Sequence, residues 1–372
     1  MPVGRNSGIY GPRLQRCQKL MVEKEIDVLF LAPGPNMYYL SGFLEEPGER
    51  LFSLIVPQSG EPFFIVPKMY EQHVRVFTWV EKLVCWEDSE NPNTVLSATM
   101  SRVITKRPAI AVDSTMWSRF LLMLLAILPD AEYLDAASVM NPLRINKTSE
   151  EILLMARSAE IADVAFTETV KECREGMTEH EVAAKIVNEM RRLGADSVNF
   201  EPITGSGPNG ALPHHRSGDR RLQRGDLVVL DYGCVCHGYF SDITRTIAVG
   251  GCDDERRKVY SIVRSAQEKA FQAAAEGVEA QNVDKAAREV IEAAGYGSFF
   301  VHRTGHGIGL EVHEEPYIVA GNPMKLEEGM AFSIEPGIYL PEKFGVRIED
   351  AVVIQAGRAQ RLNKCTHELV II

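Results

Sequence analysis

Short apolar runs separated by turn residues characterise the first part of this chain of 372 residues. These runs predict β-strands at residues 27–32, 51–56, 63–66 and 109–112. A longer apolar stretch at residues 117–128 has the length of a helix and predicts a buried one. Strands that alternate with helical stretches are typical of an α/β domain, which we place at residues 1–141.

The apolar pattern changes to a helical period after residue 141. Thr148 and Glu151 form a capping box, in which two side chains satisfy backbone N–H groups at the start of a helix. Apolar positions then recur at helical spacing at Ile152, Met155, Ala159, Ala162, Phe166 and Val170. A second capping box, Thr178 with Glu181, predicts that another helix starts there.

The same plan of elements is repeated further along the chain. Helices are predicted at residues 254–275 and 283–294, and strands at residues 227–231, 238–248, 330–335 and 351–355. We therefore expect an α+β domain over residues 142–372, with four helices packed outside a curved antiparallel sheet. Because the plan occurs twice, its halves should be related by a pseudo-two-fold axis.

Sequence motifs are duplicated together with the elements. Thr204-Gly205-Ser206-Gly207 resembles Thr304-Gly305-His306-Gly307, and a histidine follows each copy, at His214 and His313. Two similar units that face each other can bring matching side chains to one central point. The duplication therefore indicates where a functional site should lie.

Acidic residues occupy matching positions in the two copies. Asp231 follows the apolar run 227–230, and Glu335 follows a similar run in the second copy. A further acid comes later in each copy, at Asp242 and Glu349. A carboxylate at the end of an apolar strand is costly to bury without a cation or a donor. Their convergence, with His306, predicts a metal site.

The donor set of four carboxylates and one imidazole favours hard or borderline divalent ions. We expect Mn²⁺ first, with Co²⁺, Zn²⁺ and Fe²⁺ as alternatives. Carboxylates that bridge would hold two ions about 3.5–4 Å apart, and a water between them would be acidified to a hydroxide. Such a centre also polarises a carbonyl, so it suits hydrolysis of an acyl or phosphoryl bond.

Composition and charge limit the classes of partner that the protein could bind and the cellular compartment in which we expect it. The net charge of −11 argues against nucleic acid or an anionic membrane surface as a partner. The start, Met1-Pro2-Val3-Gly4-Arg5, lacks the apolar core of a signal peptide. The most apolar run, 120–128, is far shorter than the roughly 20 residues that span a bilayer. Seven cysteines without framework-like spacing suit reduced thiols in the cytoplasm.

One local cluster, Cys234-Val235-Cys236-His237, has the residue types of a metal site. Structural zinc normally requires a second pair of ligands, and the surrounding residues alternate as in a strand. We therefore interpret the two cysteines as small buried side chains on one strand face, and expect His237 and His215 to be neighbours of the site or surface residues.

The spacing of the five donors resembles that of the pita-bread metallopeptidases, which include methionine aminopeptidase, aminopeptidase P and prolidase. The motifs that carry the resemblance are Asp231-Tyr232-Gly233, Ser241-Asp242-Ile243-Thr244-Arg245-Thr246, Gly305-His306-Gly307-Ile308-Gly309, Ile334-Glu335-Pro336-Gly337 and Arg347-Ile348-Glu349-Asp350. The stretch 36–43, Asn-Met-Tyr-Tyr-Leu-Ser-Gly-Phe, resembles the extra N-terminal domain of the proline-specific and creatinase branch. Methionine aminopeptidases lack that domain.

The resemblance implies a role for each donor. Asp231 would chelate one ion, Asp242 and Glu349 would bridge both, and His306 with Glu335 would complete the other. Glu335 would also handle the proton of the bridging water as general base or acid.

The resemblance also implies roles around the metals. His313 and His214 would contact the substrate at the scissile bond, and Arg347 would orient carboxylates. His302 would line the proline pocket or pass protons. The family also implies a homodimer in which one subunit's N-terminal domain shapes the pocket of the other.

Two proline-specific activities compete. A dipeptidase must recognise the free carboxylate of proline, usually with a basic residue, which the family pattern places four residues after His313. That position is Tyr317, so we favour an aminopeptidase P-like activity on peptides with proline second, with prolidase as the alternative. A basic group could arrive from elsewhere, including a partner subunit.

More distant alternatives share the scaffold. A creatinase-like amidinohydrolase needs no metal, and a metal-dependent C–S lyase would be expected to alter the donor set. A non-catalytic binding module would be expected to have lost it. The five intact donors disfavour all three.

Overall fold

The computed structural model describes residues 7–104, 107–198 and 200–372. The chain forms two compact units, Met1–Arg144 and Ile145–Ile372. The boundary that we expected between residues 141 and 142 falls inside a helix, Ala137–Arg144, and the division comes at the end of that helix. Residues 1–5, on which the expectation about a signal peptide rests, lie outside the described residues. No helix within the described ranges is long and apolar enough to cross a membrane.

The first unit contains a mixed sheet of six strands in the order β4-β3-β2-β1-β5-β6. Its strands are β1 (Val28–Leu31), β2 (Ser53–Pro57), β3 (Phe63–Pro67), β4 (Lys82–Trp86), β5 (Ala109–Val112) and β6 (Glu132–Asp135). The four predicted strands are confirmed as β1, β2, β3 and β5. The edge strands β4 and β6 were not predicted, and both are largely half-buried or exposed.

Among the described residues of this unit, six helices and one 3₁₀ turn accompany the sheet. They are α1 (Ser7–Glu23), α2 (Pro35–Ser41), η1 (Lys68–Tyr70), α3 (Glu71–Phe77), α4 (Pro92–Met100), α5 (Ser118–Ile127) and α6 (Ala137–Arg144). The prediction that α5 is a buried helix is wrong. Phe120 and Leu124 are buried, but Leu122 is 63% exposed and Leu125 40% exposed. A helix that packs on one side buries only one stripe, and these two leucines lie off it.

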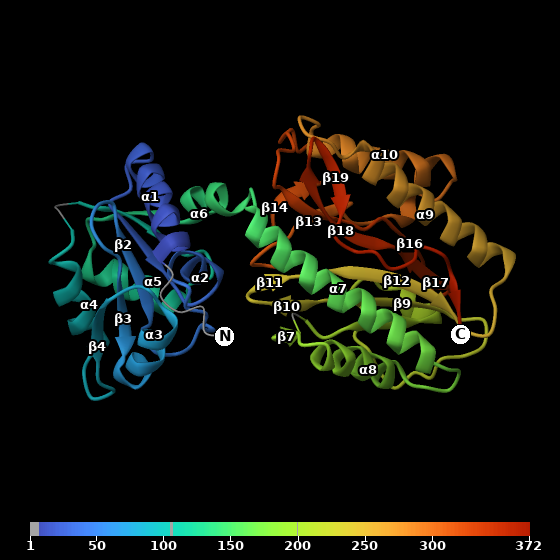
Figure 1. The fold of residues 1–372 in the computed structure, drawn as a ribbon, viewed down its shortest axis with the longest axis horizontal. Coiled ribbons are helices and arrows are strands. Elements are labelled where there is room, and N and C mark those ends of the chain that lie inside the picture. Colours follow the sequence, from blue (N-terminus) through green and yellow to red (C-terminus); the bar gives the residue numbers. More distant parts are fainter. Residues whose placement is uncertain (1–6, 105–106, 199) are drawn as a thin grey trace. The chain divides into compact units, whose positions relative to one another are not determined.

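The second unit contains a sheet of nine strands (Figure 1). Its main path runs β14-β13-β15-β18-β12-β9-β8, with β19 beside β18 and β20 beside β12. The strands are β8 (Ile203–Ser206), β9 (Leu227–Tyr232), β12 (Ile243–Ala248), β13 (Gly305–Gly307), β14 (Glu314–Ile318), β15 (Ala331–Ile334), β18 (Glu349–Gln355), β19 (Arg358–Arg361) and β20 (Val370–Ile371). Two small sheets accompany it, formed by β7 (Ser197–Val198), β10 (Cys234–Cys236) and β11 (Tyr239–Phe240), and by β16 (Gly337–Leu340) and β17 (Phe344–Arg347).

Four long helices belong to this unit, as predicted: α7 (Ser149–Glu172), α8 (Glu179–Arg192), α9 (Asp254–Ala273) and α10 (Ala280–Ala293). The unit also has two 3₁₀ turns, η2 (Gly207–Ala211) and η3 (Gly297–Phe299). Both predicted capping boxes are confirmed at the starts of α7 and α8. At α7, the Thr148 N–H donates to Glu151 Oε2 at 2.7 Å, and the Glu151 N–H donates to Thr148 Oγ1 at 3.3 Å.

The sheet has internal symmetry. From the central pair β12 and β18, the next strands outward are β9 and β8 on one side and β15 and β13 on the other. One apolar core packs α7 and α8 against β9 and β12, and another packs α9 and α10 against β15 and β18. The pairs β12–β18, β12–β9 and β15–β18 are antiparallel. Among the described strands of this sheet, only β20 pairs in parallel, with β12. The predicted duplication is confirmed.

The predicted strand 238–248 is interrupted at its middle. It forms β11 and β12 as separate strands, with Ser241 and Asp242 between them. Ser241 explains the break, because its hydroxyl accepts the Cys234 N–H at 3.0 Å and its own N–H donates to the Cys234 carbonyl at 2.9 Å. Asp242 is therefore held at a strand junction instead of inside a regular strand.

Candidate metal centre

All five predicted donors line one cavity of about 1110 Å³ in the second unit. They come from the symmetric core of the sheet: Asp231 from β9, Asp242 from the junction before β12, His306 from β13, Glu335 from the end of β15 and Glu349 from the start of β18. Thr244 on β12 pairs with Asp231 on one side and with Glu349 on the other. Strand pairing therefore places acids from both halves in neighbouring positions.

Three of these donors form a close group. Asp242, His306 and Glu349 offer ligand atoms that all lie within 4.8 Å of one another. Glu335 reaches the same imidazole, with Oε1 3.3 Å from His306 Nε2, while Asp242 Oδ2 lies 3.7 Å from that nitrogen. The sequence-predicted set is thus brought together around His306, with Asp231 at its margin.

Asp231 is turned toward a buried cation. Its Oδ2 lies 2.5 Å from Nη2 of Arg347, which is only 3% exposed. Arg347 Nε donates to the Thr244 hydroxyl at 3.0 Å, and Nη1 donates to the Tyr339 hydroxyl at 2.8 Å. Arg347 therefore contacts the donor Asp231 directly. It is linked to a second donor, Glu349, through the Thr244 hydroxyl, which hydrogen-bonds to both side chains.

Three carboxylate oxygens in this group have no hydrogen-bond partner among the described residues: Asp231 Oδ1, Asp242 Oδ1 and Glu349 Oε1. A buried polar atom without a partner costs about 1–3 kcal/mol, and more when it is charged. One such atom comes from each of three neighbouring strand positions, so the arrangement fits a divalent cation that takes oxygen ligands.

Burial raises the pKa values of three carboxylate donors, which a bound cation would lower again, and it lowers that of the histidine. Burial first, and then neighbouring carboxylates, raise the pKa of Asp242 and of Glu349 well above their ordinary values. Burial is also the main cause that raises the pKa of Glu335 to about 7. Burial lowers the pKa of His306 to about 3, so its imidazole is neutral and able to donate a lone pair.

His302 takes part in a chain of hydrogen bonds beside the acids. Its Nδ1 lies 2.7 Å from the carbonyl oxygen of Arg303, and its Nε2 lies 2.8 Å from the Tyr339 hydroxyl. The carbonyl can only accept, so Nδ1 carries the hydrogen and Nε2 accepts from Tyr339. Burial lowers the pKa of His302 to about 4, which keeps this neutral tautomer at neutral pH.

The two predicted substrate-contacting histidines lie at the surface of the cavity. His214 and His313 are both exposed and line it. The His313 ring packs edge-on against His306, with 4.2 Å between ring centroids. Tyr317 is placed differently, because it is absent from the cavity lining within the described residues and its ring lies beneath the guanidinium of Arg303.

The residues expected to be neighbours of the site or surface residues have partners of their own. His215 lines the cavity, and its Nε2 lies 2.7 Å from Oε2 of the buried Glu179. Cys234 and Cys236 are both buried on β10, as the alternation predicted. The exposed His237 follows them at a turn, where its N–H donates to Asp196.

Comparison with known proteins agrees with this geometry. The model of metallopeptidase family M24 matches residues 154–356, and that of the creatinase/prolidase N-terminal domain matches residues 13–146. The chain belongs to metallopeptidase family M24. The pita-bread fold and the recognition made from the sequence motifs are thereby confirmed.

Full-length M24 relatives resemble the chain throughout. A crystal structure of prolidase from Thermococcus sibiricus has a TM-score of 0.95 and 42% identity, covering 98% of this chain and 99% of its own. An Xaa-Pro dipeptidase from Pyrococcus furiosus is 37% identical over 96% of this chain and 99% of its own length. The structure of an X-Pro aminopeptidase from Thermotoga maritima is 33% identical, with a TM-score of 0.85, covering 96% of this chain and 99% of its own.

These relatives favour a dipeptidase, the alternative activity, over the activity that we first chose from the sequence. That choice, an aminopeptidase P-like enzyme, depended on the absence of a basic residue at Tyr317. Relatives with 37–42% identity are named prolidase, Xaa-Pro dipeptidase or dipeptidase, whereas the X-Pro aminopeptidase is 33% identical. The inference from a single position was therefore too strong.

Sequence reasoning missed three side chains of the M24 site: Thr244, Arg303 and Tyr339. Thr244 lies inside a quoted motif, and its position two residues after Asp242 was a usable signal. Tyr339 follows Glu335 by four residues in a strand that the sequence did not reveal. Arg303 is flanked by His302 and Thr304, but nothing in the pattern indicated the side chain that holds it.

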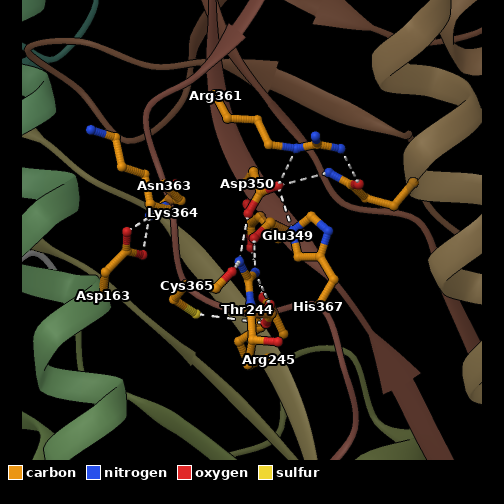
Figure 2. Close-up of polar contacts among 12 residues, drawn as sticks. Asp163, Thr244, Arg245, Glu349, Asp350, Arg361, Asn363, Lys364, Cys365 and His367 are labelled. Carbon is orange, nitrogen blue, oxygen red and sulfur yellow. Dashed lines mark hydrogen bonds and ion pairs between the residues drawn. The ribbon is translucent and has the colours of Figure 1, made fainter.

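A buried charge network supports the M24 centre from the opposite face of β18. Asp350 follows Glu349, so its side chain points the other way. Its carboxylate contacts Arg245 at 2.7 Å, His367 at 2.8 Å and Arg361 at 3.0 Å (Figure 2). Arg245 Nη1 also donates to the Glu349 carbonyl at 2.5 Å. The backbone that carries Glu349 is thus fixed from behind.

Proposed function

We propose that this chain is an Xaa-Pro dipeptidase that works with two divalent metal ions bound by Asp231, Asp242, His306, Glu335 and Glu349. The observation that carries the metal assignment is the set of three buried carboxylate oxygens that have no hydrogen-bond partner among the described residues and come from both halves of the sheet. The identity to proteins named prolidase and Xaa-Pro dipeptidase supports the substrate class.

The donor chemistry supports Mn²⁺ as the first ion to test, with Co²⁺, Zn²⁺ and Fe²⁺ as alternatives. Two such ions would polarise the scissile carbonyl and lower the pKa of a bound water. Proton transfer, substrate contact and orientation of the donors would then be performed by side chains of this chain.

Glu335 would handle the proton of the attacking water as general base or acid, the role that the family resemblance implies. His313, exposed on the cavity wall, would hydrogen-bond the region of the scissile carbonyl, and His214, exposed on the same wall, would contact the substrate near the scissile bond. Arg347 would keep Asp231 oriented, since the two are already paired.

His302 fits a positioning role better than proton transfer. Both of its ring nitrogens are already engaged, by the Tyr339 hydroxyl and by the Arg303 carbonyl. It therefore holds the wall of the cavity beside the proline ring of the substrate. Proline offers no N–H at the scissile bond, so recognition must come from shape and from the ends of the substrate.

A paired assay tests the proposal. The purified protein, loaded with Mn²⁺, is given an Xaa-Pro dipeptide and an Xaa-Pro-Yaa tripeptide, with EDTA-treated protein as control. Preferential cleavage of the dipeptide, abolished by EDTA and by Asp242→Asn or Glu349→Gln, is expected. Release of only the first residue from the tripeptide, at the higher rate, would instead identify an aminopeptidase P. Cleavage of neither with metal bound would reject proline specificity.

A homodimer is proposed from the family resemblance. Light scattering during gel filtration would measure the mass directly, and a mass close to 41.4 kDa would reject the dimer.

A further inference from the structure

Arg303 is a cation in the cavity wall without an acidic partner. Its side chain is half-buried and lines the same cavity as the five donors. No carboxylate of the described residues forms an ion pair with it. Arg347 differs, because Asp231 already neutralises it at 2.5 Å. Arg303 is therefore free to bind an anion that enters the cavity.

The position of Arg303 is fixed from both ends. Its guanidinium carbon lies 4.6 Å from the centroid of the Tyr317 ring, a cation–π contact that orients the planar group. Its carbonyl accepts from His302. The next residue, Thr304, is buried, and its N–H and hydroxyl donate to Asp284 at 3.1 and 2.7 Å. A side chain held in this way loses less entropy when it binds.

Arg303 is also close enough to the reacting centre for a short substrate. Arg303 lines the same cavity as His306, His313 and Glu335, and it lies three residues before His306 in the chain. In a dipeptide, the carboxylate carbon is three bonds from the scissile carbonyl carbon, so they lie at most about 4 Å apart. A group that binds this carboxylate must therefore stand at the edge of the donor set.

We propose that Arg303, held on the ring of Tyr317, binds the free carboxylate of the proline residue and restricts cleavage to dipeptides. This inference rests on the proposed dipeptidase function and names its specificity residue. It also explains the tyrosine at position 317, where a basic residue was expected: the position supports the cation that comes from the start of β13. An amide at the same place, as in a longer peptide, could not form the two parallel charged hydrogen bonds of a carboxylate.

The test compares Arg303→Met, Arg303→Lys and wild type on two substrates, an Xaa-Pro dipeptide and its C-terminal amide, with Mn²⁺. Arg216→Met is the matched control, since Arg216 lines the same cavity, is more exposed and has no ion pair with a described residue. Loss of the bonds should lower kcat/KM for the dipeptide about 10- to 100-fold in Arg303→Met. The kcat/KM for the amide should change less than about threefold. Arg303→Lys, which keeps the charge without the fork, should fall between.

The outcomes separate this inference from the function on which it rests. Equal losses on dipeptide and amide in Arg303→Lys and Arg303→Met, with Mn²⁺ content and melting temperature like wild type, would overturn the inference alone. A selective loss of the dipeptide in Arg216→Met, with Arg303→Met unaffected, would overturn it too. Failure of the wild type to cleave the dipeptide would overturn the proposed function together with it.

Discussion

The Thr244 hydroxyl donates a 2.6 Å hydrogen bond to Oε2 of Glu349, and it accepts one from Nε of Arg347. The other oxygen of the same carboxylate, Oε1, is left without a partner among the described residues. The threonine thus holds one side of Glu349 and leaves the other side facing the donor group. Its position on β12, opposite both Asp231 and Glu349, makes it the link between two metal donors.

Thr244→Val should weaken metal binding without unfolding the protein. Loss of an outer hydrogen bond that orients a ligand lowers metal affinity roughly 10- to 100-fold, and calorimetric titration with Mn²⁺ measures it. Thr204→Val is the control, because the buried Thr204 hydroxyl has no partner in the described part of the chain and its loss should leave affinity unchanged. Equal affinities of Thr244→Val and wild type would contradict the role.

His313→Ala should lower turnover while leaving metal content nearly intact. The side chain is exposed on the cavity wall and packs against His306 without belonging to the close group of Asp242, His306 and Glu349. Loss of one donor to the scissile carbonyl typically lowers kcat by roughly 100-fold or more. Metal analysis and kcat are measured together, with His180→Ala, another residue of the cavity wall, as control. If His313→Ala instead lost its bound metal, His313 would have to be a metal ligand.

The metal-free protein should lose stability as pH rises from about 4.5 to about 7. Mainly because of burial, the pKa of Glu335 is raised from 4.5 to about 7, so the folded state binds more protons than the unfolded state in this window. Protonation therefore favours folding, at about 1.4 kcal/mol per unit of pKa shift. Thermal melts of EDTA-treated protein should show a flatter pH dependence for Glu335→Gln than for wild type. Parallel curves for the two proteins would refute the assignment.

Asp350→Asn should destabilise the second unit strongly. Arg245 and Asp350 are both almost fully buried, so removal of the carboxylate leaves an uncompensated buried cation and costs about 3–5 kcal/mol. Urea denaturation measures the change in the free energy of unfolding. Glu255→Gln breaks the exposed pair with Lys343, 3.0 Å apart, and should cost at most about 1 kcal/mol. A loss from Asp350→Asn as small as this would argue against the network.

Local signals in the sequence were sufficient for much of the second unit. The capping boxes at Thr148 and Thr178 fix two helix starts through bonds between residues three apart. Asp231 and Glu335 follow apolar runs at matching places in the two copies, and a further acid comes later in each, so their convergence could be expected from the duplication. Both features depend on short-range patterns that the sequence displays directly.

The remaining features depend on contacts between distant segments. The stacking of Arg303 on Tyr317 joins the two sides of a strand pair, and neither residue type alone indicates it. The break at Ser241 depends on its bonds to Cys234 across a turn. The exposed leucines of α5 could not be told from buried ones, because apolar composition does not report which face a helix packs.

The pairing of β12 with β18 predicts how the protein would behave if its chain were cut between the two halves. These strands join the two halves through the pairs Ile243–Asp350 and Thr244–Glu349. Cleavage in the connection between β12 and α9 would leave Asp231 and Asp242 on one fragment and His306, Glu335 and Glu349 on the other. Each fragment would expose a strand edge that the other fragment pairs with in the intact sheet. Two inactive pieces should therefore reassemble by complementation, and restored hydrolysis would report that β12 and β18 pair again.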